Sequence, residues 1–194
     1  IAGECPSFVS VHVEEGAGPG KVTPPSLPDR FPEPIQPSLD GPYAIYIPGV
    51  GGTGVLSLNA MLARAAVKDG LNVKTYDQSG AAQKWGAVVS SLIIAKPEDN
   101  IPSNKISSGQ ADLYLALDMA AGTNPTNMSV VGGTKTAAAV NSEMLPTGEM
   151  ARNVYFQPDQ SGMQGFIKGS MRKGGFAAVP ALSIAEGLFG NYIL

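Results

Sequence analysis

The sequence predicts an α/β fold: a Rossmann-like three-layer sandwich with a mostly parallel sheet, preceded by a Pro-rich extended N-terminal segment. Three observations predict this class. Short strand-like segments are apolar along their whole length, as expected of strands that are buried on both faces. Helical patterns or long connections separate these segments, as they do in parallel sheets. A glycine-rich turn joins the first segment to a helix with one apolar face.

The chain divides into three parts, and its 194 residues are enough for one domain of ordinary size. Residues 18–42 hold half of the 16 prolines, so we expect an extended linker there, because each proline fixes φ and lacks an amide donor. Residues 1–17 are expected to be a junction segment from a preceding domain. Residues 43–194 are expected to form the Rossmann-like domain, and their apolar end predicts that this domain is truncated at its C-terminus.

The predicted elements follow one another from residue 43. The first strand covers residues 43–47, a β-prone run that stops at Pro48. A helix follows the glycines, because apolar residues recur at helical spacing over residues 55–66 and Gly70 offers a stop. Further strands are expected at residues 72–76, 87–95, 113–117 and 137–140.

The C-terminal part of the sequence is less regular. Helical spacing predicts a helix over residues 181–189. No helix or strand is predicted for residues 162–175, which are interrupted by several glycines. This stretch carries Lys168, Arg172 and Lys173. We interpret them as a solvated basic face, with contact to an anion or an acidic partner domain as the alternative.

Composition excludes several classes of function. A formal net charge of -3 and a pI near 5.1 provide no basic surface for nucleic acid. The sequence contains no apolar run long enough to span a membrane and no signal segment at its start, so a cytoplasmic protein is expected. A single cysteine excludes an internal disulfide framework.

The glycine cluster after the first strand satisfies the pattern GxGxxG through Gly49, Gly51 and Gly54. It follows a strand and opens a helix, which is the context that a phosphate-binding turn requires. Asp77, at the end of the second strand, lies where the ribose-binding acid of a dinucleotide site belongs. NAD or FAD binding is therefore one interpretation. The alternative is that the glycines only let the turn pack against a neighbouring domain.

A polar loop follows the second strand and departs from the pattern of dinucleotide-binding dehydrogenases. It gathers Gln78, Gln83, Lys84 and the only tryptophan, Trp85, near the carboxyl end of the sheet. Ligands of open α/β sheets bind at that edge, so we expect ligand or partner contacts in this loop. The alternative is a solvated connection in which Trp85 is a packing anchor.

Three sequence blocks, in this order, are more specific than the glycine pattern. They are residues 49–56 (GVGGTGVL), 77–90 (DQSGAAQKWGAVVS) and 145–149 (LPTGE). Together they resemble the gamma domain of 2-oxoacid:ferredoxin oxidoreductases, closest to the fused indolepyruvate:ferredoxin oxidoreductases. The resemblance extends over residues 44–189. Residues 5–9 (CPSFV) resemble the junction that follows the thiamine diphosphate domain in the fused chains.

The resemblance implies an enzyme that oxidatively decarboxylates a 2-oxo acid, such as an arylpyruvate, to an acyl-CoA. Its cofactors would be thiamine diphosphate, iron–sulfur clusters and coenzyme A, and its acceptor ferredoxin. This segment would serve as a scaffold and interface toward other domains or subunits of an oligomer, with no catalytic residue of its own and no activity in isolation. Cys5 is a candidate iron–sulfur ligand in the full-length enzyme only.

The glycine loop and the polar loop supply the candidate cofactor-binding residues, because the amides at the helix start suit a coenzyme A phosphate. These residues are Gly49, Gly51, Gly52, Thr53, Gly54, Asp77, Gln78, Gln83 and Lys84. Two other functions stay open. One is an NAD- or FAD-binding domain of another oxidoreductase, which would bind the dinucleotide tightly. The other is a non-enzymatic interaction module, which would bind no small molecule.

Overall fold

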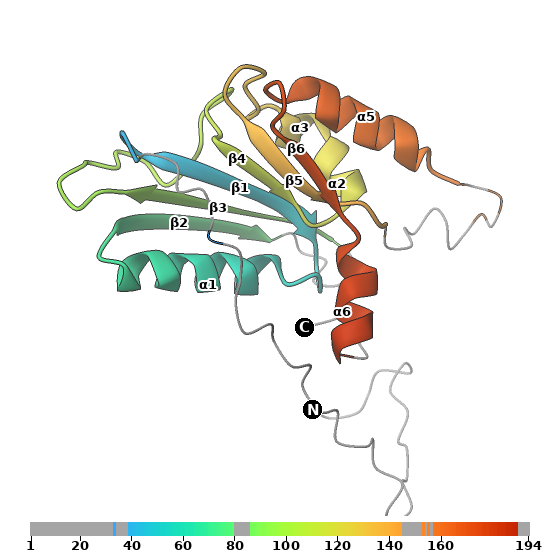
Figure 1. Ribbon diagram of the computed structural model, residues 1–194, viewed down its shortest axis with the longest axis horizontal. Coiled ribbons are helices and arrows are strands. Elements are labelled where there is room, and N and C mark those ends of the chain that lie inside the picture. Colours follow the sequence, from blue (N-terminus) through green and yellow to red (C-terminus); the bar gives the residue numbers. More distant parts are fainter. Residues whose placement is uncertain are drawn as a thin grey trace, which may run out of the picture.

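The computed structural model describes residues 39–79, 86–144 and 157–189, together with the isolated residues 33, 153 and 155. These residues form a six-stranded sheet with helices on both faces (Figure 1). The strands are ordered β2-β3-β1-β4-β5-β6 across the sheet. Their bounds are β1 Tyr43–Val50, β2 Asn72–Ser79, β3 Ala87–Ala95, β4 Leu113–Ala116, β5 Ala137–Asn141 and β6 Phe176–Val179.

Strand β3 is antiparallel to all the other described strands. It pairs antiparallel with β1 and with β2, whereas β1, β4, β5 and β6 pair in parallel. The predicted Rossmann-like sandwich with a mostly parallel sheet is therefore confirmed. The direction of β3 could not be predicted, because the apolar sequence of a buried strand has the same pattern in either direction.

Helices complete the outer layers of the sandwich (Figure 1). Helix α1, Val55–Lys68, packs on β1, β2 and β3 from one face. Helices α2, Met119–Thr123, α3, Pro125–Met128, and α5, Gln160–Ser170, lie on the opposite face. Helix α6, Ala181–Phe189, follows β6 and matches the predicted helix. None of the helices in the described ranges combines the length and apolar composition needed to cross a membrane.

Each face of the sheet has its own core. Under α1, Ile47 and Leu92 are fully buried next to Val55. On the other face, Tyr114 and Ile167 are fully buried, and they join the sheet to α5. Burying a large apolar side chain stabilises a fold by about 1.5–3 kcal/mol. These two cores therefore fix the sheet between its helices.

The first strand is longer than predicted, because β1 continues through Pro48 to Val50. The N–H of Leu117 donates to the carbonyl of Pro48 at 3.0 Å, so the backbone of Pro48 faces β4. Its missing N–H therefore leaves the ladder between β1 and β3 intact. The prediction that the strand stops at Pro48 was wrong for this reason.

Helix α5 and strand β6 were not predicted from the sequence. Helix α5 contains three glycines, each of which disfavours a helix by about 1 kcal/mol relative to alanine. The carboxylate of Asp159 caps it by accepting from the N–H of Gly162 at 2.8 Å, and Ile167 anchors it in the core. This helix is thus stabilised by packing and by its N-cap rather than by the helix propensity of its residues. Strand β6 is stabilised by pairing with β5.

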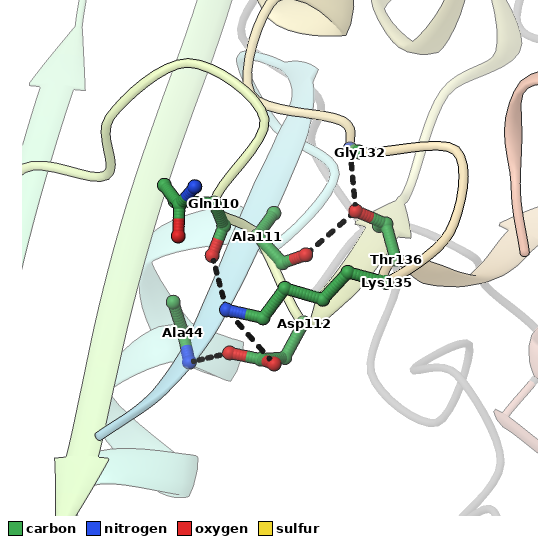
Figure 2. A network of polar contacts seen from close by, with 7 residues as sticks. All are labelled: Ala44, Gln110, Ala111, Asp112, Gly132, Lys135 and Thr136. Atoms are coloured by element: carbon green, nitrogen blue, oxygen red, sulfur yellow. Dashed lines mark hydrogen bonds and ion pairs between the residues drawn. The ribbon is translucent and has the colours of Figure 1, made fainter. Parts of the chain in front are cut away.

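A buried threonine connects backbone segments at the amino edge of the sheet, where the parallel strands begin (Figure 2). Thr136 is fully buried directly before β5. Its hydroxyl donates to the carbonyl of Ala111 at 2.6 Å and accepts from the N–H of Gly132 at 2.8 Å. Two backbone groups that would otherwise be unpaired are thus satisfied by one side chain.

An ion pair completes this network beside Thr136 (Figure 2). Asp112 precedes β4, and its Oδ2 accepts from the N–H of Ala44 at 2.9 Å. Its Oδ1 lies 3.2 Å from Nζ of Lys135, which also donates to the carbonyl of Gln110 at 3.1 Å. The contacts tie the starts of β1, β4 and β5 together.

Candidate functional site

The predicted glycine loop connects β1 to α1, and two of its glycines have positive φ. Gly52 has φ of 94° and Gly54 has φ of 79°, values that residues with a Cβ rarely adopt. Gly49 is needed for another reason, because an added Cβ would lie 2.5 Å from Cγ2 of Val55. The loop therefore requires glycine for its turn and for the close approach of the helix to the strand.

A hollow of about 190 Å³ opens at the start of α1. None of the described residues that line it carries a charge. They are Val50, Gly51, Gly52, Gly54, Val55, Leu56, Ser57 and Val88. The N-cap residue, Gly54, has no side chain to accept from the first turn. The amides of that turn therefore lack a cap, and the positive end of the helix dipole faces the hollow.

Two of the predicted loop residues already use their donors within the protein. The N–H of Gly51 donates to the carbonyl of Gly86 at 2.8 Å. The N–H and the hydroxyl of Thr53 both donate to the carbonyl of Val50, at 3.2 and 2.7 Å. We conclude that Gly51 and Thr53 shape the loop, and that the donors available to a ligand are the N–H groups of Gly52, Gly54 and the first turn of α1.

Asp77 lies in β2, and β3 separates it from the glycine loop. Its Oδ1 accepts from Nδ2 of Asn59 at 2.9 Å and from the hydroxyl of Ser90. Asn59 and Ser90 are buried, so Asp77 joins α1, β2 and β3 in one polar cluster. In dinucleotide-binding folds the second strand lies directly beside the first, which brings its acid to the glycine loop. Here the inserted β3 removes that proximity.

The other predicted site residues do not add to the hollow. Gln78 is exposed in β2 and is not among the described residues that line it. Gln83, Lys84 and Cys5 lie outside the described residues, as does Trp85. The structure thus brings together the glycines and Thr53, and places Asp77 and Gln78 two strands away from them.

Sequence reasoning missed Asn59 and Asp118. Asn59 is 1% exposed, and its Oδ1 has no hydrogen-bond partner. Asn59 could have been recognised from the sequence, because it is a polar residue on the apolar face of the predicted helix. Asp118 follows β4, at the switch point between β1 and β4, and accepts from the N–H of Ala121 at 2.8 Å. Burial raises the pKa of Asp118, and hydrogen bonds from the backbone amides of Ala121 and Ala120 oppose the shift.

Two further side chains fix α6 at the carboxyl edge. Oδ1 of Asn141 accepts from the N–H of Ala181 at 3.1 Å. The carboxylate of Glu143 accepts from the hydroxyl of Ser183 and from its N–H, the latter at 2.8 Å. These hydrogen bonds lower the pKa of Glu143, the one from the hydroxyl most. Both residues therefore cap the first turn of α6.

The arrangement suits one chemical task, the binding of a small anionic group. Uncapped amides at a helix start attract phosphate, and the hollow is smaller than the roughly 300–1,000 Å³ of pockets that enclose whole ligands. The described residues contain no group of three or more His, Cys, Asp or Glu side chains that could hold a metal ion.

Comparisons with known proteins agree on one family. The family model for pyruvate ferredoxin/flavodoxin oxidoreductase matches residues 44–193. Indolepyruvate oxidoreductase subunit IorB of Methanothermobacter thermautotrophicus is 36% identical over 76 residues, which are 39% of this chain and 37% of that protein. The match thus spans little more than a third of this relative.

Two solved structures share the fold. The PORC subunit of pyruvate oxidoreductase from Thermotoga maritima is 18% identical with a TM-score of 0.54, over 79% of this chain and 70% of that chain. The 2-oxoglutarate:ferredoxin oxidoreductase from Magnetococcus marinus, solved with 2-oxoglutarate, coenzyme A and succinyl-CoA bound, is 19% identical with a TM-score of 0.52. That match covers 79% of this chain and 22% of the other.

Proposed function

Because the chain belongs to the pyruvate ferredoxin/flavodoxin oxidoreductase family as a gamma-type domain, we propose that it serves an enzyme that oxidatively decarboxylates an arylpyruvate. Such an enzyme joins the acyl group to coenzyme A, releases carbon dioxide and passes two electrons to ferredoxin. Indolepyruvate is the proposed substrate, because the indolepyruvate oxidoreductase subunit is among the relatives. The enzyme is expected in the cytoplasm, as an oligomer.

The proposed role of this domain is to hold a phosphate group of coenzyme A while acting as a scaffold for the other domains. The hollow at the start of α1 carries this proposal. Its amides lack a side-chain cap, and its volume suits one phosphate group rather than a whole coenzyme. The rest of the coenzyme would lie against other parts of the enzyme.

The strand order disfavours the alternative of a dinucleotide site. A ribose acid must lie beside the glycine loop, but β3 separates Asp77 from β1. The carboxylate of Asp77 is also engaged by Asn59 and Ser90. A pyrophosphate could reach the helix start, yet the second anchor of a dinucleotide is absent from the described residues around the hollow.

Thiamine diphosphate and iron–sulfur clusters would supply decarboxylation and electron transfer in other parts of the enzyme. The residues of this domain would bind and orient, and no proton transfer is assigned to them. Residues 1–17 would be the junction to a preceding domain and residues 18–42 the linker. Cys5 in that junction would be a cluster ligand in the full-length enzyme.

The test is an activity assay on the longer polypeptide that carries this domain, reconstituted with thiamine diphosphate and iron–sulfur clusters. We expect reduction of an electron-acceptor dye that requires both indolepyruvate and coenzyme A. A parent protein that binds no clusters, ignores coenzyme A and reduces NAD with another substrate would contradict the proposal and favour the dinucleotide alternative.

A further inference from the structure

Strand β2 forms one edge of the sheet, and α1 lies over the face beside it (Figure 1). No strand among the described residues pairs with its outer side. An edge strand carries a row of backbone N–H and carbonyl groups without strand partners, and proteins commonly shorten or cover such strands. β2 has eight residues, so its outer side offers a full-length strand edge.

The pairing register shows which residues of β2 face outward. The carbonyl of Ala44 is hydrogen-bonded on the β4 side, so the backbone groups of the next residue, Ile45, face β3. Ile45 pairs with Leu92, and Leu92 pairs on its other side with Thr75. Because the backbone groups of Leu92 are used by β1, those of Thr75 point away from β3. The same holds for every second residue of β2, including Val73.

The face that α1 covers has an apolar flank above this edge. Nδ2 of Asn59 donates to Asp77 of β2, so this side of the helix overhangs the edge strand. Leu56, Ala60 and Val67 follow one another in the row of side chains next to Asn59. We call these three residues the α1 flank. Leu56 is 46% exposed and Val67 is 60% exposed, so the described residues leave the flank largely uncovered.

The opposite face of β2 is basic. Nζ of Lys74 donates to the carbonyl of Ile101 there, and Nζ of Lys105 lies 4.9 Å from the centre of the Tyr76 ring. A hollow of about 580 Å³ lies beside the edge, and none of the described residues that line it is acidic. They are Val73, Lys74, Thr75, Pro102, Ser103 and Asn104.

A strand added to β2 would place its side chains alternately on these two faces. Those on one face would meet the apolar α1 flank, and those on the other would meet Lys74 and Lys105. The segment that fits therefore alternates apolar and acidic residues. In this mode of recognition, backbone hydrogen bonds supply affinity and the alternate side chains supply specificity.

One described side chain already occupies a position on the edge. Nδ2 of Asn104 donates to the carbonyl of Thr75 at 3.3 Å, where the N–H of an added strand would bind. Asn104 is exposed, so its side chain can turn aside for a backbone donor. The contact also confirms that the carbonyl of Thr75 is accessible from outside the sheet.

A second copy of this chain fits the edge poorly. In a symmetric antiparallel pair of β2 strands, each side chain stays on its own face of the sheet. Lys74 of the second copy would then add a positive charge to the basic face, and its Asp77 would lie against the apolar α1 flank. Like charges on neighbouring strands destabilise their pairing.

From these observations we propose that the outer edge of β2 binds an extended segment of an adjoining part of the same oxidoreductase, and that this segment alternates apolar and acidic residues. The identity of the assembly rests on the proposed function, since the relative IorB is a subunit of such an enzyme. The docking site extends along β2, whereas the proposed phosphate site lies at the start of α1.

Hydrogen exchange in the reconstituted oxidoreductase, resolved at single residues by fragmentation mass spectrometry, tests the pairing. The control is the N–H of Ala178, which faces away from β5 at the other edge of the sheet. Relative to intrinsic rates, we expect the N–H of Thr75 to exchange at least roughly tenfold more slowly than that of Ala178. Equal protection would overturn the proposal. The readout needs no turnover, so it is independent of the test of the proposed activity.

Charge reversal tests the acidic character of the segment. Lys74→Glu should speed exchange at Thr75 several-fold, because it repels the acids of the bound strand. Lys74→Gln keeps a donor for the carbonyl of Ile101 and should have a smaller effect. Lys96→Glu, an exposed position after β3, should have none. An unchanged rate in Lys74→Glu, or an equal increase in Lys96→Glu, would contradict an acidic partner.

Photo-crosslinking identifies the occupant. With p-benzoylphenylalanine in place of Val67, we expect capture of a peptide from an adjoining domain or subunit in which apolar and acidic residues alternate. The same group in place of Phe166, which is 54% exposed on α5 at the opposite face, should not capture that peptide. Capture of a second copy or of another segment of this chain, or no capture at Val67, would overturn the proposal.

Discussion

The two ends of the parallel strands are built in opposite ways. At the amino edge, Thr136 and Asp112 satisfy backbone groups of three neighbouring segments, and Lys135 neutralises the acid. At the carboxyl edge, α1 starts without a side-chain cap, and a hollow lies in front of its amides. Because the N-cap of α1 is Gly54, the missing side-chain cap costs this helix start only about a few tenths of a kcal/mol.

This difference suggests that stability and binding are separated along the strands. Buried polar groups that are fully paired rigidify a structure, whereas donors without partners remain available to a ligand. The other helix ends at the carboxyl edge are capped, α2 by Asp118 and α6 by Glu143. The open start of α1 is thus an exception among its neighbours. Changes at the amino edge should therefore affect folding, and changes at the hollow should affect ligand binding.

The largest effect is expected from Thr136→Val, which keeps the shape of the side chain and removes its hydroxyl. The carbonyl of Ala111 and the N–H of Gly132 then lose a buried partner. We expect the free energy of unfolding to fall by about 2–3 kcal/mol, measured by urea denaturation. A loss below about 0.5 kcal/mol would show that the amino edge is not the stabilising one.

A somewhat smaller loss of stability is expected from Asp77→Ala. This substitution removes the acceptor of buried Asn59 and Ser90, so the free energy of unfolding should fall by about 1–3 kcal/mol. Asp77→Asn keeps an acceptor and should lose less than half as much. If instead Asp77→Ala left stability unchanged and abolished binding of NAD, Asp77 would be a ribose ligand and the comparison of the two edges would fail.

The smallest effect is expected from Lys135→Met. The side chain of Lys135 is 41% exposed, and exposed ion pairs stabilise proteins by about 0–1 kcal/mol. Denaturation at low and high salt measures this contribution, which should shrink as salt screens the pair. A loss well above 1 kcal/mol that is independent of salt would mean that the ion pair, and not Thr136, dominates the amino edge.

Much of the fold followed from the sequence. The strand at residues 87–95 and the helix at residues 181–189 were predicted with the observed bounds, because both have strong apolar patterns. Helix α5 could not be predicted, since its glycines disfavour a helix and only the Asp159 cap and Ile167 packing hold it. The position of β3 between β1 and β2 is a property of strand pairing, which no local pattern contains.

The candidate site was predicted in part. The glycine loop was found because Gly49, Gly52 and Gly54 are required by local geometry, which leaves a sequence signature. The use of the Gly51 donor by Gly86 could not be foreseen, since it depends on the approach of β3. Asp77 matched the spacing of a ribose acid, but the inserted strand changed its neighbours.

The most direct test of the separation between the two edges is Ser57→Asp in the reconstituted oxidoreductase. Ser57 lies in the first turn of α1 and lines the hollow, so an added carboxylate repels a phosphate there while favouring the helix. We predict that the KM for coenzyme A rises roughly tenfold, or about 1.4 kcal/mol, while the KM for indolepyruvate stays the same.

Two variants serve as controls for this measurement. Ser161→Asp places the same charge in the first turn of α5 on the opposite face and should leave the KM for coenzyme A unchanged. Ser57→Asn adds similar bulk without charge and should raise it less than about twofold. An unchanged KM for coenzyme A in Ser57→Asp, or an equal increase in both aspartate variants, would contradict the phosphate site at the start of α1.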